Sequence, residues 1–200
     1  MYRSLGAEAP DVLAEPIKRQ PVPALVLPPT AYLNVKVDGR ESTYFEWMGA
    51  GLYSADRRSS AMHGNLMLLH EIRYGFDEKR FHLRVDVFSE ALKELRDAEF
   101  RITFRAEQEL RVVVRFQGGR VTGYLVESRD LCLLGPDEVV KVAFDRILEV
   151  SVAKEMFFLA DRKSISLGVA LWEGGLPMDL LPAEGMLEIQ LGEENFAWNV

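Results

Sequence analysis

The chain has little of several features that would signal a particular chemistry, beginning with cysteine. It holds one cysteine, Cys132, which excludes an internal disulfide framework. Because Cys132 lies between two leucines, we expect a small buried side chain rather than a nucleophile. No apolar run approaches the roughly 18 residues of a membrane-spanning helix, and the N-terminal stretch MYRSLGAEAPDV has no apolar signal core. Export is therefore not indicated, and we expect no membrane partner.

Basic residues and chemical signature motifs are also scarce. The formal net charge is −7 and the pI is about 5.1, which argues against binding to a nucleic-acid backbone. The sequence has no GxGxxG or GxxxxGKS/T loop, no GxSxG elbow and no HExxH pair, so nucleotide sites and serine nucleophiles have no support. The three histidines, His63, His70 and His82, have no ligand spacing, and we expect no metal site built on them.

What the chain does have is the alternation of half-buried strands, clearest over 65–87. Every second residue from Phe81 to Val87 is apolar, and the residues between them are polar, which is typical of a strand with one wet face. A glycine and polar residues at 75–79 indicate a turn, and hence a hairpin. The expected hairpin register is Tyr74 opposite Phe81 and Glu71 opposite Arg84, with His70 toward the core and His82 toward water.

The alternation recurs at short spacing through the rest of the chain. We expect strands over 31–37, 43–47, 52–53, 99–104, 109–116, 121–127, 131–134, 139–144, 147–152, 164–173 and 186–191. Short helices are expected within 89–95 and 153–160. Because no regular alternation of strands and helices is present, a parallel sheet is not expected. The prediction is an all-β fold, an antiparallel β-sandwich with one or two short helices.

The N-terminal region differs in composition from the rest. Residues 1–30 hold six of the nine prolines, and proline removes backbone donors. We therefore expect a proline-rich connector or strap over 1–30, in which Ala24–Leu27 docks on the body. A β-sandwich domain is expected over 31–200.

Aromatic residues give the strongest binding signal in the sequence. Tyr44, Phe45, Trp47 and Tyr53 crowd one short region. Tyrosine and tryptophan combine an apolar ring with a polar tip, so exposed rings of this kind can stack on the C–H faces of sugars. The competing interpretation is that the rings fill the core.

Several phrases resemble a known family. YRSLGAEAPDVLAEPIK, VDGRESTYFEWMGAGLYS, SAMHG, IRYGFD with FHLRVD, and ISLGVALWEGGLPMDLLPAEGMLEI are similar to the C-terminal β-sandwich domain of family 57 glycoside hydrolases, which are α-amylase- and glucanotransferase-like. That domain is in turn similar to DOMON-like sandwiches and to family 9 carbohydrate-binding modules. The resemblance implies a cytoplasmic role in α-glucan metabolism. The family's catalytic carboxylates lie in a barrel that this chain does not match.

Three hypotheses follow, and the first is a non-catalytic module that contacts α-glucan or a related carbohydrate. Its expected site comprises Trp47, Tyr44 and Tyr53 for stacking, and Glu46, Arg57 and Asp86 as hydroxyl partners. The second is a purely structural domain that packs on a glycoside hydrolase catalytic domain. The third, most remote, is a stand-alone hydrolase that uses Glu46 and a second carboxylate roughly 5–10 Å away. No cofactor is expected, although related sandwiches can carry a structural calcium ion.

Overall fold

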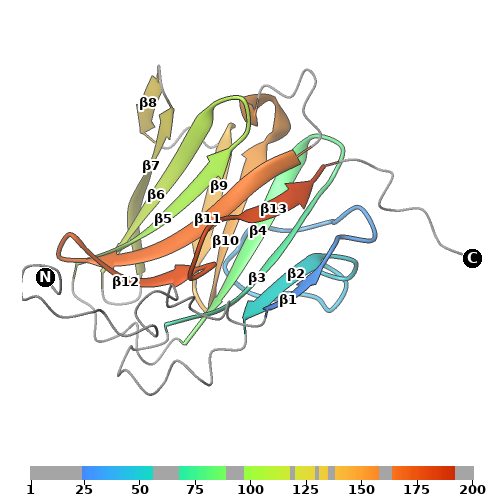
Figure 1. The fold of residues 1–200 in the computed structure, drawn as a ribbon, viewed down its shortest axis with the longest axis horizontal. Helices are drawn as coiled ribbons and strands as arrows, with labels where there is room; N and C mark the ends of the chain where they lie inside the picture. Colours follow the sequence, from blue (N-terminus) through green and yellow to red (C-terminus); the bar gives the residue numbers. More distant parts are fainter. Residues whose placement is uncertain are drawn as a thin grey trace, which may run out of the picture.

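The fold consists of two antiparallel sheets packed face to face (Figure 1). The computed structural model describes residues 24–55, 68–88, 97–117, 120–128, 131–134, 138–157 and 164–191. Sheet A has the strand order β1 (Ala24–Leu27), β2 (Gly51–Ala55), β3 (Leu69–Phe76), β4 (Arg80–Val87), β10 (Ile147–Ala153), β9 (Val140–Phe144). Sheet B has the order β12 (Leu176–Leu181), β11 (Ser164–Glu173), β5 (Ala98–Arg105), β6 (Glu109–Gln117), β7 (Arg120–Ser128), β8 (Leu131–Leu134), with β13 (Leu187–Gln190) also paired to β11. The predicted all-β, antiparallel sandwich is confirmed.

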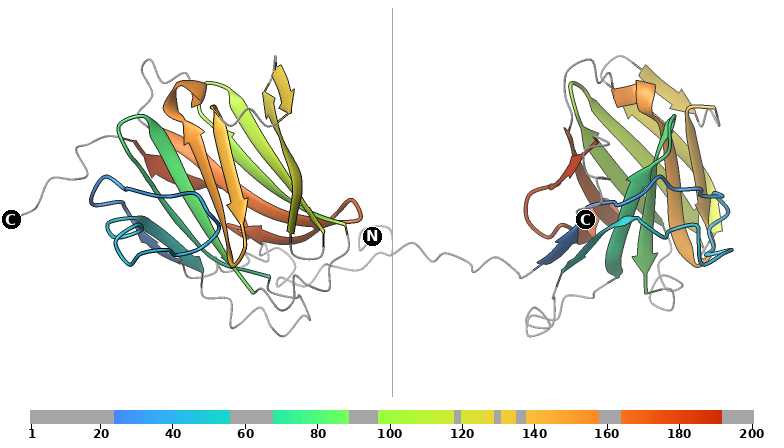
Figure 2. Two further views of the ribbon diagram at one scale, coloured as in Figure 1. Left: turned by 180° about the vertical axis from the view of Figure 1, so that it is seen from behind. Right: turned by 90° about the vertical axis from the view of Figure 1, so that its right-hand side faces the viewer.

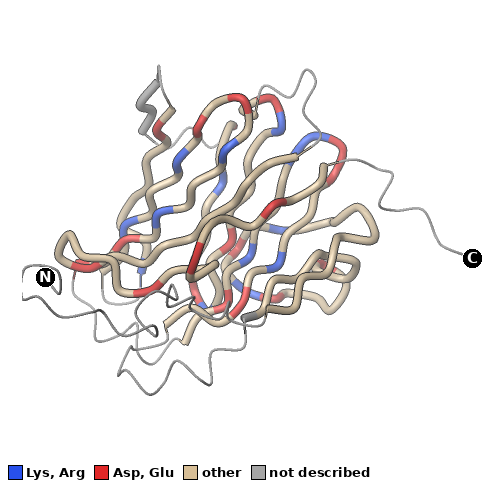
Figure 3. Tube along the Cα trace, in the orientation of Figure 1, with Lys and Arg blue, Asp and Glu red and all other residues tan. Residues whose placement is uncertain are grey.

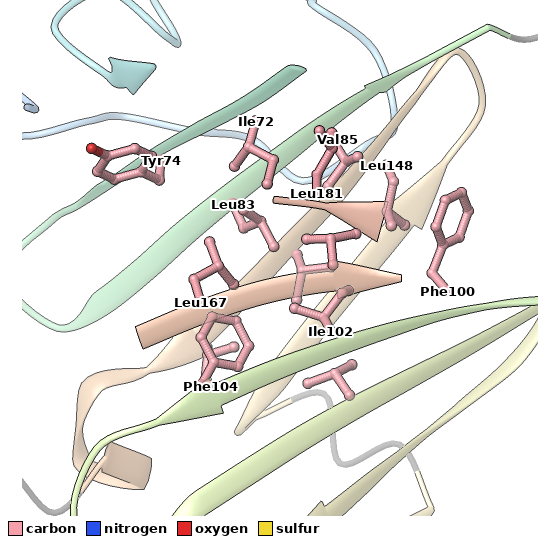
Figure 4. Close-up of a cluster of buried hydrophobic side chains, with 14 of the residues drawn as sticks. Ile72, Tyr74, Leu83, Val85, Phe100, Ile102, Phe104, Leu148, Leu167 and Leu181 are labelled. Atoms are coloured by element: carbon pink, nitrogen blue, oxygen red, sulfur yellow. The ribbon is translucent and has the colours of Figure 1, made fainter. Parts of the chain in front are cut away.

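The core lies between the two sheets (Figure 4). Sheet A contributes side chains such as Ile72, Leu83 and Val85, and sheet B contributes Ile102 and Leu167, all of them fully buried. β5 and β11 alternate strictly between buried and partly exposed positions, as period-two sequences require when one face is apolar. Each sheet therefore keeps a second, outward face for polar side chains.

Helical structure is minor. A four-residue 3₁₀ helix, Lys154–Phe157, lies within the stretch predicted as a short helix after β10. The other predicted helix, at 89–95, falls outside the described residues. Within the part of the chain that the structure describes, no helix has the length and apolar character needed to cross a membrane.

The largest error of the sequence prediction concerns residues 28–50. Strands were expected over 31–37 and 43–47, but this segment has turns and irregular backbone instead. In the chain it connects β1 to β2, and it runs across the outward face of sheet A (Figure 2, left). We refer to it as the cover segment. Leu33 is its apolar anchor, 4% exposed, and a Cβ on Gly75 of β3 would meet Leu33 Cδ1 at 2.6 Å. Its backbone meets the sheet at single points rather than in a ladder: the Leu33 N–H donates to the Phe76 carbonyl at 3.0 Å, and the Gly39 carbonyl accepts from the Ile147 N–H at 3.2 Å.

The central hairpin closes in a different register from the expected one. Phe81 pairs with Phe76, and Tyr74 pairs with Leu83. The reason is the turn, because Asp77 Oδ1 accepts hydrogen bonds from the N–H groups of Lys79 and Arg80, both at 2.7 Å. This Asx-type turn places the reversal at 77–79, further along the chain than expected.

The new register changes which polar side chains face one another. Glu71 lies opposite Asp86, and Arg73 lies opposite Arg84, instead of the predicted pairing of Glu71 with Arg84. A bulge between Leu69 and Glu71 accompanies it. Opposite charges then pair along each strand, Arg73 with Glu71 and Arg84 with Asp86.

The two strand histidines have the opposite environments from those predicted. His70, expected in the core, lies at the bulge with its side chain 55% exposed. His82, expected in water, is 3% exposed. His82 does point away from the core, but the face on which it lies also carries other buried polar residues and is covered.

Two shorter elements complete the comparison with the sequence. Ala24–Leu27, expected to dock on the body, forms β1 and pairs with β2 at the edge of sheet A. β12 was not predicted, because its leucines and its proline do not alternate in hydropathy. The remaining strands from β5 onward lie where the sequence placed them, to within a few residues.

Candidate functional site

The aromatic residues predicted as a sugar platform do not form one. Trp47 is 3% exposed and Tyr53 is 7% exposed, so neither ring is available for stacking on a ligand. Glu46 is also buried, at 6% exposure. Of the three predicted rings only Tyr44 is open to solvent, 76% exposed and in edge-to-face contact with Phe45. The prediction is corrected for Trp47, Tyr53 and Glu46, which belong to the interior.

Trp47 is buried because it helps to fasten the cover segment to sheet A. The fastening point is Glu149 on β10, whose side chain is fully buried. Glu149 accepts hydrogen bonds from the backbone N–H groups of Asp38 and Gly39, at 2.9 and 2.8 Å, and from the Trp47 indole N–H at 3.2 Å. Burial raises the pKa of Glu149, whereas these three donors act in the opposite direction. Gly39 has φ of +80°, a backbone conformation that glycine adopts readily.

Glu46 has a similar local role. Its Oε2 accepts hydrogen bonds from the N–H groups of Ser42 and Thr43, at 3.0 and 3.4 Å. This resembles the way a carboxylate closes the start of a helical turn. Glu46 therefore shapes the turn that exposes Tyr44 and Phe45, and its Oε2 is engaged by the backbone of that turn.

Asp86, the predicted hydroxyl partner, is engaged by Arg84. Arg84 Nε lies 2.7 Å from Asp86 Oδ1, and Arg84 Nη2 lies 3.2 Å from Asp86 Oδ2, which makes a two-pronged contact. Arg84 Nη1 also donates to Glu41 of the cover segment at 2.9 Å. Burial raises the pKa of Asp86, Arg84 opposes this, and a hydrogen bond with Glu71 adds to it. Arg57, the last predicted site residue, lies outside the described residues.

Three side chains near the bulge have metal-ligand chemistry. These are His70, Glu71 and Asp86, and each offers one potential ligand atom. The three atoms all lie within 4.8 Å of one another, and the described residues contain no other such group. Arg73 and Arg84 already neutralise the two carboxylates, so a cation would compete with two guanidinium groups. We therefore assign no cofactor to this group.

His82 and Arg80 complete the polar layer beneath the cover. His82 Nε2 lies 2.9 Å from Asp77 Oδ2, while its buried Nδ1 has no hydrogen-bond partner among the described residues. Arg80 donates to the hydroxyl and the carbonyl of Ser151, at 2.7 and 2.9 Å. Apart from His82 Nδ1, these polar groups bond to other groups of the protein, which indicates a structural role.

The outward face of sheet B is open, and it contains a groove along β11. The outward residues of β11 are small until its end: Ser164, Ser166, Gly168, Ala170, and then Trp172. Their neighbours on β5 are larger and polar, with Arg101 beside Ala170, Thr103 beside Gly168 and Arg105 beside Ser166. On the other side stand Leu180 and Met186. A floor of small residues between taller walls leaves a volume of about 420 Å³.

Trp172 marks one end of the groove. The Arg101 guanidinium carbon lies 3.8 Å from the centre of the Trp172 ring, a cation–π stack. Arg101 Nε also donates to Glu99 at 2.6 Å, so the guanidinium is held from its side. The indole N–H of Trp172 is buried and has no acceptor among the described residues. At the opposite end the Ser166 hydroxyl donates to Glu188 at 2.5 Å.

Paired charges lie on β5, β6 and β7, and two of the arginines among them also line the groove. Figure 3 marks the positions of the charged residues along these strands. Glu109 contacts both Arg105 and Arg111, at 3.0 and 2.8 Å, and Arg111 also reaches Glu127 at 3.4 Å. The hydrogen bond from Arg105 lowers the pKa of Glu109. These side chains are mostly well exposed, so each pair contributes little to stability. Their donors and acceptors remain within reach of a ligand.

The sequence contained a signal for this groove that the prediction did not use. The alternation in 164–173 placed Trp172 on the same face as two serines, a glycine and an alanine. The outward positions of 99–105 are Glu99, Arg101, Thr103 and Arg105. Only the pairing of β11 with β5 brings the two rows together, and strand order is not readable from alternation.

No protein-family model, no curated protein and no solved structure matches this chain. These comparisons therefore do not test the resemblance to family 57 glycoside hydrolases. The function of the site is inferred from its geometry.

Proposed function

We propose that this chain is a non-catalytic β-sandwich module, associated with a glycoside hydrolase, that contacts α-glucan or a related carbohydrate through the groove on sheet B. One observation carries the proposal: the groove has an apolar end and wall, formed by Trp172, Leu180 and Met186, and a hydrogen-bonding wall, formed by Arg101, Thr103 and Arg105. A sugar ring has the same two kinds of surface, an apolar C–H face and a rim of hydroxyl groups. The volume of about 420 Å³ lies within the range of small-ligand sites.

The positions of the buried carboxylates support a non-catalytic role. Glu46 and Glu149 both accept backbone N–H groups beneath or within the cover segment. Among the described residues that line the groove, none is aspartate or glutamate. A glycoside hydrolase needs two carboxyl groups that flank the scissile bond, and the groove does not offer such a pair. The resemblance to a C-terminal domain without the catalytic barrel points the same way.

The test is titration calorimetry with maltooligosaccharides on the wild type and two variants. Trp172→Ala removes the apolar end, and Gly168→Val fills the floor, where a new Cβ would make only ordinary contact with Met186 at 3.6 Å. Both should weaken binding at least about tenfold. The matched control is Gly123→Val on β7, where a Cβ meets nothing within 4 Å, and its binding should equal that of the wild type.

Two results would contradict the proposal. A well-folded wild type that binds none of the oligosaccharides would reject carbohydrate contact. Release of reducing sugar from starch, persisting in a sample free of other hydrolases, would reject the non-catalytic role and return to the stand-alone hydrolase.

A purely structural module is the second candidate, and exposed apolar side chains favour it. Leu25 and Leu27 of the edge strand β1 are 52% and 46% exposed, and Tyr44 and Phe45 are 76% and 69% exposed. Side chains of this kind are typical of a surface that docks on another domain. Co-expression with a family 57 catalytic barrel tests it. Elution as one complex, lost in a Leu25→Ser/Leu27→Ser variant, would support docking, and separate elution would reject it.

A further inference from the structure

The charged side chains that line the groove are of one sign. Arg101, Arg105 and Arg111 are lining residues, and no carboxylate belongs to the lining among the described residues. This is unexpected for a chain whose formal net charge is −7. Guanidinium groups can donate to the hydroxyl oxygens of a neutral sugar, but their charge and fork geometry match the oxygens of an anion better.

The strand register places these arginines around one point. Arg101 and Arg105 lie two residues to either side of Thr103 on β5, so all three share the outward face. Arg111 of β6 is the direct cross-strand partner of Thr103. On the other side Thr103 faces Gly168, which has no side chain. The space above Thr103 and Gly168 is therefore lined by the side chains of three arginines and by Thr103, with the Arg101 guanidinium over the Trp172 ring.

The carboxylates that hold the arginines leave donors free. A guanidinium has five N–H donors, and among the described residues Arg105 makes one hydrogen bond, from its Nε to Glu109. The Arg105 and Glu109 side chains are 61% and 40% exposed, and an exposed pair of this kind contributes little to stability. An incoming anion can therefore rearrange or share these contacts at small cost. Phosphate and carboxylate groups match the arginine fork in geometry.

We infer that the groove takes an anionic carbohydrate, one whose sugar carries a phosphate or carboxylate group that lies over Thr103 and Gly168 among the three arginines. The inference rests on the proposed function, since the sugar itself would contact Trp172 and the apolar wall. It goes further by naming the ligand class and the residues that select it.

The experiment compares four ligands at low ionic strength by titration calorimetry. They are a neutral maltooligosaccharide, the same oligosaccharide with one phosphate monoester, an oligosaccharide of similar length with one uronic acid, and inorganic phosphate alone. We expect the phosphorylated or uronic ligand to bind at least about tenfold more tightly than the neutral one, since hydrogen bonds to charged groups are stronger than those between neutral groups. Added salt should reduce that preference.

Variants identify the residues responsible. Arg105→Gln combined with Arg111→Gln should remove the preference, measured within that variant as the ratio of its affinities for the anionic and the neutral oligosaccharide. Because Arg105 also belongs to the hydrogen-bonding wall, the double variant is expected to bind the neutral oligosaccharide more weakly as well. The matched control is Arg40→Gln, because Arg40 is a similarly exposed arginine, at 66%, that pairs with Asp145 on the other side of the sandwich. Arg40→Gln should retain the preference in full.

Each outcome decides a different point. Equal affinity for neutral and anionic oligosaccharides would overturn the anionic preference and leave carbohydrate contact intact. Inorganic phosphate binding as tightly as the phosphorylated sugar, with no affinity for the neutral one, would leave an anion site and overturn the proposed function. An anionic preference that survives in the double variant would overturn the assignment to these arginines. Failure of all four ligands would overturn both proposals.

Discussion

The outward faces of the two sheets are alike in sequence and opposite in use. Both alternate apolar inward residues with polar outward ones, and both carry arginines next to carboxylates. On sheet A these outward groups are buried: His82, Arg84, Glu149 and Ser151 are all less than 9% exposed. On sheet B the corresponding side chains are partly or well exposed, with Arg105 and Arg111 at 61% and 40%.

This difference indicates that the cover segment determines whether the polar side chains of a face are buried and held by fixed partners or exposed to solvent. Where residues 28–50 lie over the sheet, each carboxylate and guanidinium has several fixed partners in low dielectric, and losing one partner is costly. Where the sheet is open, the same chemical groups make weak, exchangeable pairs. The covered face therefore holds the structure together, and the open face is free for recognition.

Removing Glu149 should give the largest effect. Glu149→Ala leaves two backbone N–H groups and the Trp47 indole N–H without their acceptor. We expect a loss of about 3–5 kcal/mol in the free energy of unfolding, measured by urea denaturation. Glu127→Ala on the open face is the control, since the Glu127 side chain is 42% exposed and lies 3.4 Å from Arg111 Nη1. This variant should lower the free energy of unfolding by less than about 0.5 kcal/mol. Similar losses in the two variants would break the comparison.

A smaller effect should come from crowding the contact between the cover and β3. In Gly75→Ala the new Cβ would lie 2.6 Å from Leu33 Cδ1, and the buried leucine must move, at a cost of about 1–3 kcal/mol. Gly123→Ala, on an open part of β7, should be close to neutral. In a double-mutant cycle with Leu33→Ala, the cost of Gly75→Ala should largely disappear. Additive costs would show that Leu33 does not sit on Gly75.

The covered face should also be sensitive to acid through His82. Burial lowers the pKa of His82 below its ordinary value of 6.5, with Asp77 opposing and Arg80 and Lys141 adding to the shift. The unfolded chain then binds a proton at a pH where the folded chain does not, so the stabilising contribution is fully present above pH 6.5 and is lost as the pH falls below it. Urea unfolding across pH 5–8 should show this loss in the wild type and less of it in His82→Gln. His70→Gln serves as the control for replacing a histidine whose side chain is exposed.

The sequence predicted the sheets well wherever burial is one-sided. β5, β6 and β11 alternate cleanly, and their positions followed from that pattern alone. The cover segment was misread as two strands because its aromatic and branched residues favour strands by propensity. Its real constraint is long-range, since Trp47 and Gly39 are held by Glu149, more than a hundred positions away.

The same distinction explains what happened to the candidate site. Trp47 and Tyr53 attracted attention because they cluster in sequence, but clustering does not tell a buried ring from an exposed one. Trp172 stands apart from other aromatic residues in the sequence, and its partner Arg101 comes from a strand some seventy residues earlier. The groove depends on which strands are neighbours, and the alternation of single strands does not encode that order.

The smallest effect should come from the open face. Arg105→Gln breaks an ion pair with Glu109 in which both side chains are well exposed, so it should cost less than about 0.5 kcal/mol in urea denaturation. Arg84→Gln is the matched change on the covered face, where the guanidinium is 8% exposed and contacts both Asp86 and Glu41, and its cost should be several times larger. If Arg105→Gln were as costly as Arg84→Gln, the arginines of sheet B would be structural, and a ligand could not displace their partners cheaply. If Arg105→Gln instead leaves the free energy of unfolding nearly unchanged, the variant is folded. Any loss of anion affinity in it is then caused by the change in the groove and not by unfolding.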